Sequence, residues 1–211
     1  MQYNPGIYLI NKPRGRSSFS MVAQMRRLSG IKKVGHAGTL DPEAEGLLIV
    51  LVGKDYTRLS DSYLKLDKSY EFSLKLGENS DTGDQEGEKT SISDTVPTKK
   101  AILEALEDFK GVIEQVPPKY SAIKIDGVRA YKRARRGEEV KIKPRKVTIS
   151  KLELLKYSYP ELTLRADVSS GTYIRALGED LGKKLATGAY CTQIVRTSIG
   201  QNQLKNAMPL D

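Results

Sequence analysis

Two short segments of the chain hold the residues best suited to carry out a reaction. Asp41 lies in GHAGTLDPEAEG (residues 35–46), where the glycines allow tight turns or a close approach to a ligand. Arg175 lies in SGTYIR (residues 170–175), where a predicted strand passes into a helix. An arginine beside an aspartate keeps the carboxyl group ionised, as a nucleophile or general base must be. The two segments predict carboxylate-dependent chemistry wherever the fold brings Asp41 and Arg175 together.

Each of these residues also has an ordinary structural interpretation. Asp41 followed by Pro42 matches a helix start, with the aspartate as N-cap and the proline in the first turn. Arg175 alone would be assigned to a surface ion pair. Taken singly, both residues favour the structural interpretation, whereas their presence in two compact segments of one chain favours the catalytic one.

The positive charge of the chain is concentrated in one stretch. The chain holds 35 Lys and Arg against 26 Asp and Glu, a net charge of +9. Residues 119–151 contain twelve of the basic residues and three of the acidic ones, so the remainder balances at 23 of each. Tyr120 and Tyr131 are interleaved with these cations, a mixture that suits phosphate contacts and base stacking. The stretch predicts a polyanionic partner.

Within that stretch, GVRAYKRARRG (residues 127–137) predicts a helix with its arginines on one side. Arg129, Arg133 and Arg136 would face the same way at helical spacing, and arginine suits bidentate binding of phosphate. The alternative is a solvated helix face rich in basic residues. Nucleic acid is favoured over a membrane surface because no strong apolar face accompanies the charge.

Several classes of protein are excluded by composition. The single cysteine, Cys191, rules out an internal disulfide framework, and the lone His36 argues against a histidine metal centre or a Ser-His-Asp triad. The longest apolar run, residues 47–52, is far shorter than a membrane-spanning helix. At the N-terminus an aliphatic run precedes the positive charges, the reverse of a signal peptide. We expect a soluble, cytoplasmic protein with no membrane association.

The predicted strands and helices around these residues follow one another in an irregular order. Such an order is typical of an α+β domain with a mixed sheet. A Gly-rich acidic segment, residues 77–95, predicts a loop or a loose hairpin. Strands are predicted at residues 7–10, 47–52, 70–76, 147–155 and 162–168, and helices at 18–28, 102–109 and 173–185.

Five ordered motifs run along nearly the whole chain. They are INKPRGRSS (10–18), GHAGTLDPEAEGLL (35–48), KSYEFSLKLGENSDT (68–82), PPKYSAIKIDGVRAYKRAR (117–135) and GTYIRALGEDLGKKLATGA (171–189). In this order they resemble the motifs of the TruB family of tRNA pseudouridine synthases. The second, which contains Asp41, resembles the catalytic motif of the family and is highly specific.

The resemblance implies an enzyme that isomerises uridine to pseudouridine at position 55 in the T loop of tRNA. It implies no cofactor and no metal. The base would be flipped out, detached from its N1 bond, rotated and rejoined through C5. The sequence leaves open whether the aspartate adds to the base, attacks the sugar or removes the C2′ proton.

The resemblance also implies an architecture and a partner. We expect the pseudouridine synthase fold, an α+β fold with a mixed, mostly antiparallel central sheet flanked by helices and a catalytic RNA-binding cleft. Residues 1–211 would form one catalytic domain with a basic RNA-binding insertion at about 117–151. The partner would be the T stem-loop of tRNA, bound by a monomer that requires no protein partner.

Individual roles follow from the motif match. Asp41 would be the catalytic aspartate, Arg175 its counter-ion, and Tyr70 would stack on the target base. The alternative for Tyr70 is a core position beside Phe72 and Leu74. The remaining expected contacts are Lys12 beside the pocket, His36 among flipped nucleotides, Tyr173 as a second pocket tyrosine, Ile194 below the base, and Lys124, Arg129, Arg133, Arg135 and Arg136 on the RNA.

Some of these residues keep a structural alternative, and two features depart from the family pattern. His36 could be purely structural, and Lys12 could be a turn residue with a solvated charge. Val195 stands where the family usually has an arginine, so Arg196 alone remains of a basic pair. The sequence ends at Asp211, before the C-terminal PUA domain of bacterial relatives. We therefore expect no PUA domain, and the basic stretch would carry most of the electrostatic binding.

Two other functions stay open. One is a related synthase that acts on another RNA, which would keep Asp41, Tyr70 and Arg175 but alter the basic insertion. The other is a non-catalytic protein that binds or chaperones tRNA, against which Asp41 and Arg175 both argue. Binding without turnover would separate this second function from an enzyme.

Overall fold

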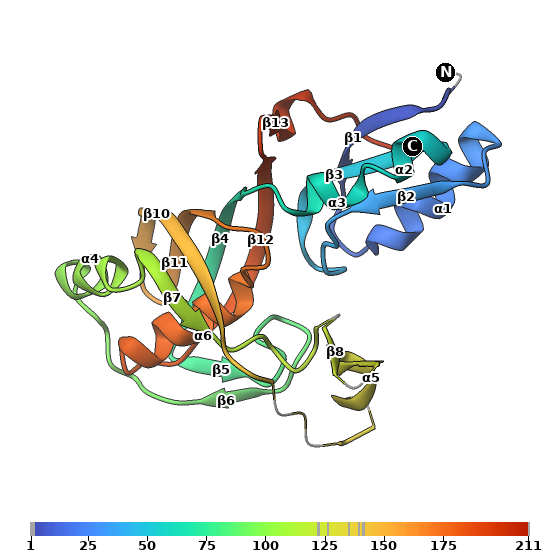
Figure 1. Ribbon diagram of the computed structural model, residues 1–211. Helices are drawn as coiled ribbons and strands as arrows, with labels where there is room; N and C mark the ends of the chain where they lie inside the picture. Colours follow the sequence, from blue (N-terminus) through green and yellow to red (C-terminus); the bar gives the residue numbers. More distant parts are fainter. Residues whose placement is uncertain are drawn as a thin grey trace. The chain divides into compact units, whose positions relative to one another are not determined.

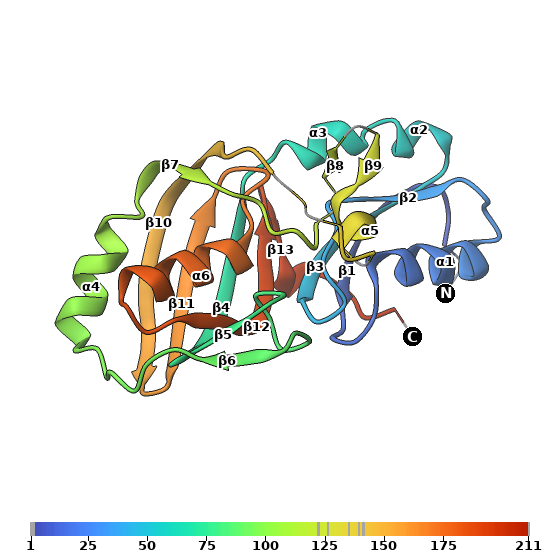
Figure 2. The same ribbon diagram turned by 90° about the horizontal axis from the view of Figure 1, so that it is seen from below.

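The computed structural model describes residues 3–210 apart from 122, 126, 135, 139 and 141. Its contacts divide the chain into two compact units (Figures 1 and 2). Unit 1 is Met1–Glu71, Asp167–Ser170 and Gln193–Asp211, and unit 2 is Phe72–Ala166 and Gly171–Thr192. The expectation of one catalytic domain over the whole chain stays a prediction.

Unit 1 is built around strand β3. Strand β1 runs antiparallel to β3 from Gly6↔Val52 to Lys12↔Gly46. Antiparallel β2 and, at Val195 and Arg196, parallel β12 pair with β3 as well. The elements of this unit are β1 (Gly6–Lys12), α1 (Ser18–Ser29), β2 (Val34–Ala37), β3 (Glu45–Val52), α2 (Lys54–Thr57), α3 (Ser60–Leu64), β13 (Asn202–Gln203), the short 3-10 helix η1 (Leu204–Asn206) and the second part of β12 (Ala189–Ile199).

The apolar run of β3 is explained by cover on both faces. Leu48, Val50 and Val52 pack in one cluster with Ile10 and with Met21, Val22 and Met25 of α1. Leu47, Ile49 and Leu51 pack in a second cluster with Ile199 and partly buried residues of α2, α3 and η1. Because side chains alternate between the faces of a strand, a strand buried on both faces is apolar at every position.

Unit 2 contains a sheet in the order β12-β4-β11-β10-β7. Its helix α6 packs closely against β4, because a Cβ added to Gly178 would lie 2.6 Å from Leu74. Two short hairpins, β5–β6 and β8–β9, lie outside this sheet. The elements are β4 (Lys68–Leu76), β5 (Glu78–Ser80), β6 (Lys89–Ser91), α4 (Lys99–Glu107), β7 (Gly111–Gln115), β8 (Lys124–Ile125), β9 (Val128–Arg129), α5 (Ala130–Ala134), β10 (Arg145–Ser158), β11 (Glu161–Val168), α6 (Ile174–Lys184) and the first part of β12; the first residues of β4 belong to unit 1.

Most predicted elements are confirmed, with the expected α+β class and mixed, mostly antiparallel sheet. Helix α1 begins where expected, with Ser17 accepting a hydrogen bond from the Ser20 amide, and ends at left-handed Gly30. The acidic segment after β4 forms the β5–β6 hairpin. Among the described residues, no helix has the length and apolar character needed to cross a membrane.

The predicted helix over residues 127–137 is wrong. Gly127, at φ +80°, turns the chain between β8 and β9, so Arg129 belongs to a strand. Helix α5 covers only Ala130–Ala134, and Arg136 lies in the turn that follows. Arg129, Arg133 and Arg136 therefore do not share one helix face, because the turn ends the helical periodicity on which that prediction depended.

Candidate active site

Asp41 lies in a turn between β2 and β3. The amide of Ala44 donates to the carbonyl of Asp41 at 3.1 Å, and residues 41–44 form no helix. The interpretation of Asp41-Pro42 as a helix start is therefore wrong. The Asp41 side chain is half-buried. A half-buried carboxylate on a tight turn can reach a substrate while its backbone is held by the protein.

The N-terminal motif anchors one side of this turn. The ammonium of Lys12 is fully buried and donates to the carbonyls of Pro42, at 3.1 Å, and of Pro13 and Arg16. The Gly15 amide also donates to the Pro42 carbonyl, at 2.9 Å. The turn is thus fixed to the end of β1. The alternative interpretation of Lys12 as a turn residue with a solvated charge is wrong, because its side chain is buried. The place of Lys12 beside a substrate pocket stays a prediction.

Two further anchors hold the residues before Asp41 and the start of β3. The Ser18 hydroxyl accepts from the Leu40 amide at 2.8 Å and contacts the Leu40 carbonyl at 3.0 Å. The guanidinium of Arg196, 1% exposed, donates to the carbonyls of Gly38 at 3.0 Å and Leu47 at 2.7 Å. Arg196 therefore has a structural role: it is a buried cation that is hydrogen-bonded to the backbone on both sides of Asp41.

Burial shifts the pKa values of Lys12 and His36. Burial lowers the pKa of Lys12 to about 8, while the carboxylates of Asp41, Glu45 and Glu43 oppose that change. Burial, and then the positive charge of Arg196, lowers the pKa of His36. The imidazole is accordingly neutral at pH 7, and its Nδ1 is buried with no hydrogen-bond partner among the described residues.

Tyr70 and Ile194 lie on neighbouring strands of the sheet. Tyr70 is 8% exposed and shares a face of β4 with Lys68 and Phe72. Its ring is thus packed as the core interpretation expects, and its stacking on a base stays a prediction. Ile194, on β12, is half-buried. Its place below the base also stays a prediction.

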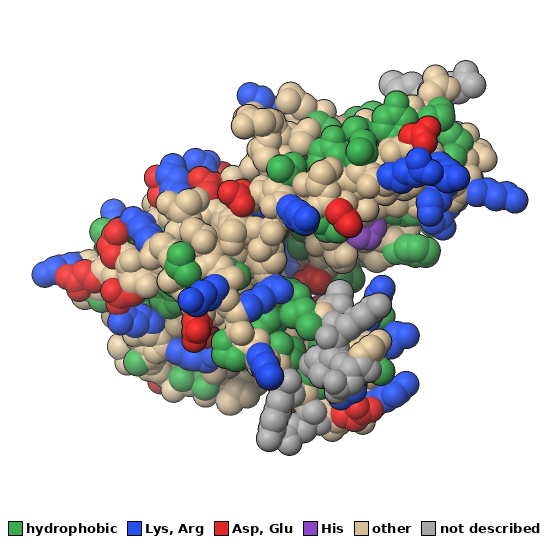
Figure 3. Space-filling model, viewed as in Figure 1, with side chains coloured by type: hydrophobic (Ala, Val, Ile, Leu, Met, Phe, Trp, Pro, Cys, Tyr) green, Lys and Arg blue, Asp and Glu red, His purple; other side chains and the backbone are tan. Residues whose placement is uncertain are grey.

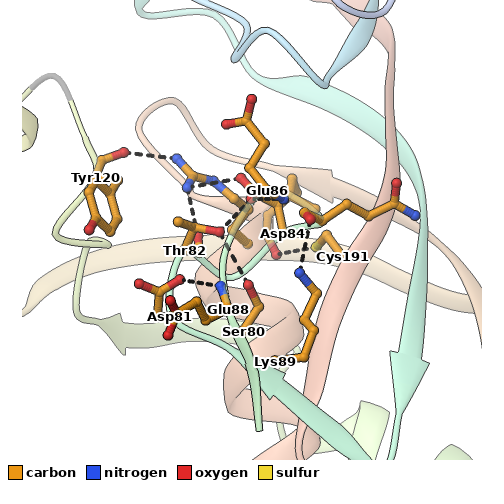
Figure 4. A network of polar contacts seen from close by, with 12 residues as sticks. Ser80, Asp81, Thr82, Asp84, Glu86, Glu88, Lys89, Tyr120 and Cys191 are labelled. Atoms are coloured by element: carbon orange, nitrogen blue, oxygen red, sulfur yellow. Dashed lines mark hydrogen bonds and ion pairs between the residues drawn. The ribbon is translucent and has the colours of Figure 1, made fainter.

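In unit 2, Arg175 is held by the segment that follows β5 and by Tyr120 (Figure 4). The guanidinium, 5% exposed, donates to the carbonyls of Thr82 at 2.7 Å and Tyr120 at 2.9 Å. It also forms an ion pair with Asp84 at 3.3 Å. Asp84 itself accepts from the Thr82 hydroxyl and the Glu86 amide. The pairing of Arg175 with Asp41, which belongs to unit 1, stays a prediction.

Tyr173 is the N-cap residue that precedes α6, and its backbone is held by the side-chain amide of a buried glutamine. Gln115, fully buried at the end of β7, accepts from the Tyr173 amide at 2.8 Å and donates to the Tyr173 carbonyl at 3.1 Å. The guanidinium of Arg145 lies 4.8 Å from the centre of the Tyr173 ring. These contacts orient the start of α6 two residues before Arg175.

The expected RNA contacts of the insertion are spread over a hairpin and a short helix. Lys124 pairs with Arg129 across the β8–β9 hairpin. Arg133 is partly buried in α5, and Arg136 is exposed with Glu138 at 3.7 Å. Arg135 lies outside the described residues. The role of these residues on RNA stays a prediction.

The chain was compared with known proteins. The N-terminal domain of the TruB family pseudouridylate synthases matches residues 26–174. The chain belongs to this family. It is similar to the tRNA pseudouridine synthase B of Protochlamydia amoebophila, with 48% identity over 96% of this chain and 77% of the relative. It is also similar to the tRNA pseudouridine synthase B of Opitutus terrae, with 42% identity over 98% and 86%.

A solved structure agrees with the TruB family fold. One chain in the crystal structure of a Cbf5–Nop10–Gar1 complex matches 93% of this chain with a TM-score of 0.72 and 26% identity. This chain spans half the length of that one. The resemblance to the TruB family and the expected pseudouridine synthase fold are both confirmed.

Two residues that hold Arg175 and Tyr173 in unit 2 were not predicted from the sequence. Asp84 pairs with Arg175, and Gln115 bonds both backbone groups of Tyr173. Asp84 is one of several acidic residues in the hairpin segment, so its spacing gave no signal. Gln115, at the end of a short strand, likewise carried none. Among the described residues, no three His, Cys, Asp or Glu side chains gather in a way that could hold a metal ion.

Proposed function

We propose that this protein isomerises uridine 55 in the T loop of tRNA to pseudouridine, with Asp41 as the catalytic carboxylate. The observation that carries the proposal is the Asp41 loop, in which the family's catalytic motif is held by Lys12, Ser18 and Arg196. Relatives named tRNA pseudouridine synthase B, at 42 to 48% identity over nearly the whole chain, support tRNA as the substrate.

The reaction conserves every atom of the nucleotide. The bond between N1 and the ribose breaks, the base turns, a bond from C5 to the same ribose carbon forms, and the hydrogen of C5 is lost while N1 gains one. Addition to the base, attack on the sugar and C2′ deprotonation all need an ionised carboxylate at a defined position. A backbone anchored at Gly38, Leu40 and Pro42 supplies that position before the substrate arrives.

Base flipping gives Arg175, Tyr70 and Tyr173 their proposed roles. The uridine must leave the stack, which costs a few kcal/mol, and an aromatic face in the pocket offsets part of that cost. Tyr70 would supply this face, with Tyr173 beside it and the guanidinium of Arg175 opposite the charge of Asp41. The contacts of Arg175 with Thr82, Tyr120 and Asp84 leave the guanidinium a single orientation in its own unit.

The proposal extends to binding and to the setting of the reaction. The cations of the insertion would bind the phosphates of the T stem-loop, with His36 among the flipped nucleotides, Lys12 beside the pocket and Ile194 below the base. A monomer would act in the cytoplasm without a protein partner. The positive charge of residues 119–151 supports the binding of a polyanion.

The deciding experiment compares the wild type with Asp41→Asn on an unmodified tRNA transcript. Pseudouridine is detected by carbodiimide labelling and primer extension, which stops at the modified position. We expect a stop at position 55 with the wild type and a rate at least about a thousandfold lower with Asp41→Asn, because no other group replaces the carboxylate. The variant should still bind the transcript.

Each other outcome points to a different function. A transcript bound tightly but left unmodified by both proteins would favour a binding or chaperone protein. A stop in another RNA, and none in tRNA, would favour a synthase with a different target. A transcript with cytidine at position 55 serves as the control for the position of the stop.

A further inference from the structure

The start of the chain forms a second basic segment, whose charge is balanced by acidic residues elsewhere in the sequence. The first forty residues contain seven Lys and Arg and no Asp or Glu. Three of the seven are occupied: Lys12 beneath the Asp41 turn, Arg14 by Glu43 at 2.8 Å, and Arg26 by the Val34 carbonyl at 2.9 Å. Within the described part of the chain, no carboxylate forms an ion pair with the other four, which are exposed: Arg16, Arg27, Lys32 and Lys33.

An exposed aromatic ring lies on α1, the helix that also carries Arg26 and Arg27. Phe19, in the first turn of α1, is 63% exposed, although a phenylalanine is usually buried. The Arg26 guanidinium lies 5.7 Å from the centre of the ring. Because Arg26 is tied to the Val34 carbonyl, this cation is held in place beside the ring. Most of the Phe19 ring remains open to a ligand.

This surface is attached to the Asp41 loop through short covalent and hydrogen-bonded paths within unit 1. Ser18, next to Phe19, bonds the backbone of Leu40, next to Asp41. Val34, which holds Arg26, begins the strand that carries His36. Figure 3 shows the histidine at the surface, with hydrophobic, basic and acidic side chains near it. An RNA bound at Asp41 would therefore have this surface at its flank.

We propose that α1 and the loop after it form a second RNA-binding surface, in which an unpaired base of the tRNA substrate stacks on Phe19. Successive phosphates of the same RNA strand would pair with the cations spread along this surface, which are Arg16, Arg27, Lys32 and Lys33. The choice of tRNA rests on the proposed function. The absence of carboxylates from this segment complements a polyanion, whereas one exposed ring without a wider apolar face is too little for a membrane surface.

The direct test uses the fact that the chain contains no tryptophan. Phe19→Trp makes the ring a unique fluorophore at the proposed contact, and Leu28→Trp is the matched control. Leu28 lies on the same helix nine positions later, half a turn away from Phe19 around the axis, and is 37% exposed. Both are made together with Asp41→Asn, so that the unmodified tRNA transcript is bound but not converted.

We expect the emission of Phe19→Trp to be quenched on titration with the transcript and to saturate at the binding stoichiometry, while Leu28→Trp does not change. In otherwise wild-type protein, Phe19→Ala should weaken tRNA binding about tenfold, which is ~1.4 kcal/mol and within the range for one stacked base. Phe19→Tyr should restore it. The loss should appear in KM and not in the turnover rate at saturating tRNA, because the proposed contact of Phe19 is with a base other than the uridine that reacts.

The two proposals fail in different ways. Wild-type protein that forms no pseudouridine, while Phe19→Trp is still quenched by tRNA, would overturn the proposed reaction and leave the surface standing. Suppose instead that the wild-type protein modifies tRNA, that tRNA leaves the emission of Phe19→Trp unchanged, and that Phe19→Ala binds tRNA as tightly as the wild type. These results would refute the proposed RNA-binding surface and would not affect the proposed reaction.

Discussion

Lys12 is fully buried, and the nearby carboxylates offset only part of the effect of burial on its pKa. Its three hydrogen bonds go to backbone carbonyls of residues 13, 16 and 42. Burial lowers its pKa from 10.5 to about 8. Lys12 therefore has a structural role, because its ammonium joins the end of β1 to the turn that carries Asp41.

The pKa of Lys12 predicts how stability depends on pH. Below about pH 8 both folded and unfolded chains hold the proton, so the cost of burying the charge is fully present. Between about 8 and 10.5 the folded chain has released the proton and the unfolded chain still holds it, so the free energy of unfolding rises with pH. We expect the free energy of unfolding of the wild type, minus that of Lys12→Met, to increase by about 1 kcal/mol per pH unit in that window.

Urea denaturation at pH 7.5, 9 and 10.5 measures this difference. Lys68, whose pKa burial also lowers to about 8, is present in both proteins and cancels. If the free energy of unfolding of the wild type, minus that of Lys12→Met, fell as the pH rises, the lowered pKa of a buried Lys12 would be contradicted.

At the scale of elements, the Asp41 loop depends on close packing against β12. Gly46 adopts φ +101°, and a Cβ at this position would lie 2.5 Å from the carbonyl oxygen of Arg196. Gly15 is also left-handed, at φ +78°, but its Cβ would meet nothing within 4 Å. A side chain at Gly15 would therefore introduce backbone strain alone, whereas one at Gly46 would introduce backbone strain and a steric clash.

Alanine at each glycine should give different costs. We expect Gly15→Ala to lower the free energy of unfolding by about 1 kcal/mol, the cost of the left-handed conformation alone. Gly46→Ala should cost about 3 kcal/mol, because β3 and β12 must also separate, and it should slow turnover by displacing the Asp41 loop. Denaturant titration and single-turnover rates measure both effects. Equal costs for the two variants would show that the loop adapts freely.

Across the whole molecule, basic surfaces occur in both units. Unit 2 carries the insertion, with Arg129 and Arg136 exposed, and unit 1 carries the cations around α1. Each phosphate contact releases counterions, so each contributes a separate increment to the salt dependence of RNA binding. The salt slope therefore reports how many cations of each surface bind RNA, without requiring the arrangement of the units.

Replacing Arg133, Arg135 and Arg136 with Ala should weaken tRNA binding and flatten its dependence on salt. Each lost contact should reduce the slope of log K against log salt by about 0.7 to 0.9, or by about 2 for the three together. Filter binding between low and physiological salt measures the slope. The control is Lys99→Ala with Lys100→Ala, exposed cations on α4 outside both surfaces. An unchanged slope in the triple variant would remove the insertion from the RNA interface.

Elements whose signals are local could be predicted from the amino-acid sequence. The Ser17 cap and Gly30 bound α1, and the unbroken apolar run of β3 follows from its burial on both faces. The five motifs also identified the TruB family, and with it Asp41 and Arg175. Neighbouring residues carry such signals, because capping, periodicity and motif spacing all act within a few turns of the chain.

The contacts that hold the candidate catalytic residues in place depend on the tertiary fold. Arg196 and Gly38 are 158 residues apart, and Arg175 and Thr82 are 93 apart, so no local pattern announces either contact. The helix expected at residues 127–137 begins only at Ala130 for a related reason: the Ala130 amide donates to the Ile123 carbonyl, which closes the hairpin before α5. A backbone group pairs with the partner that the fold supplies, and helical spacing alone does not identify that partner.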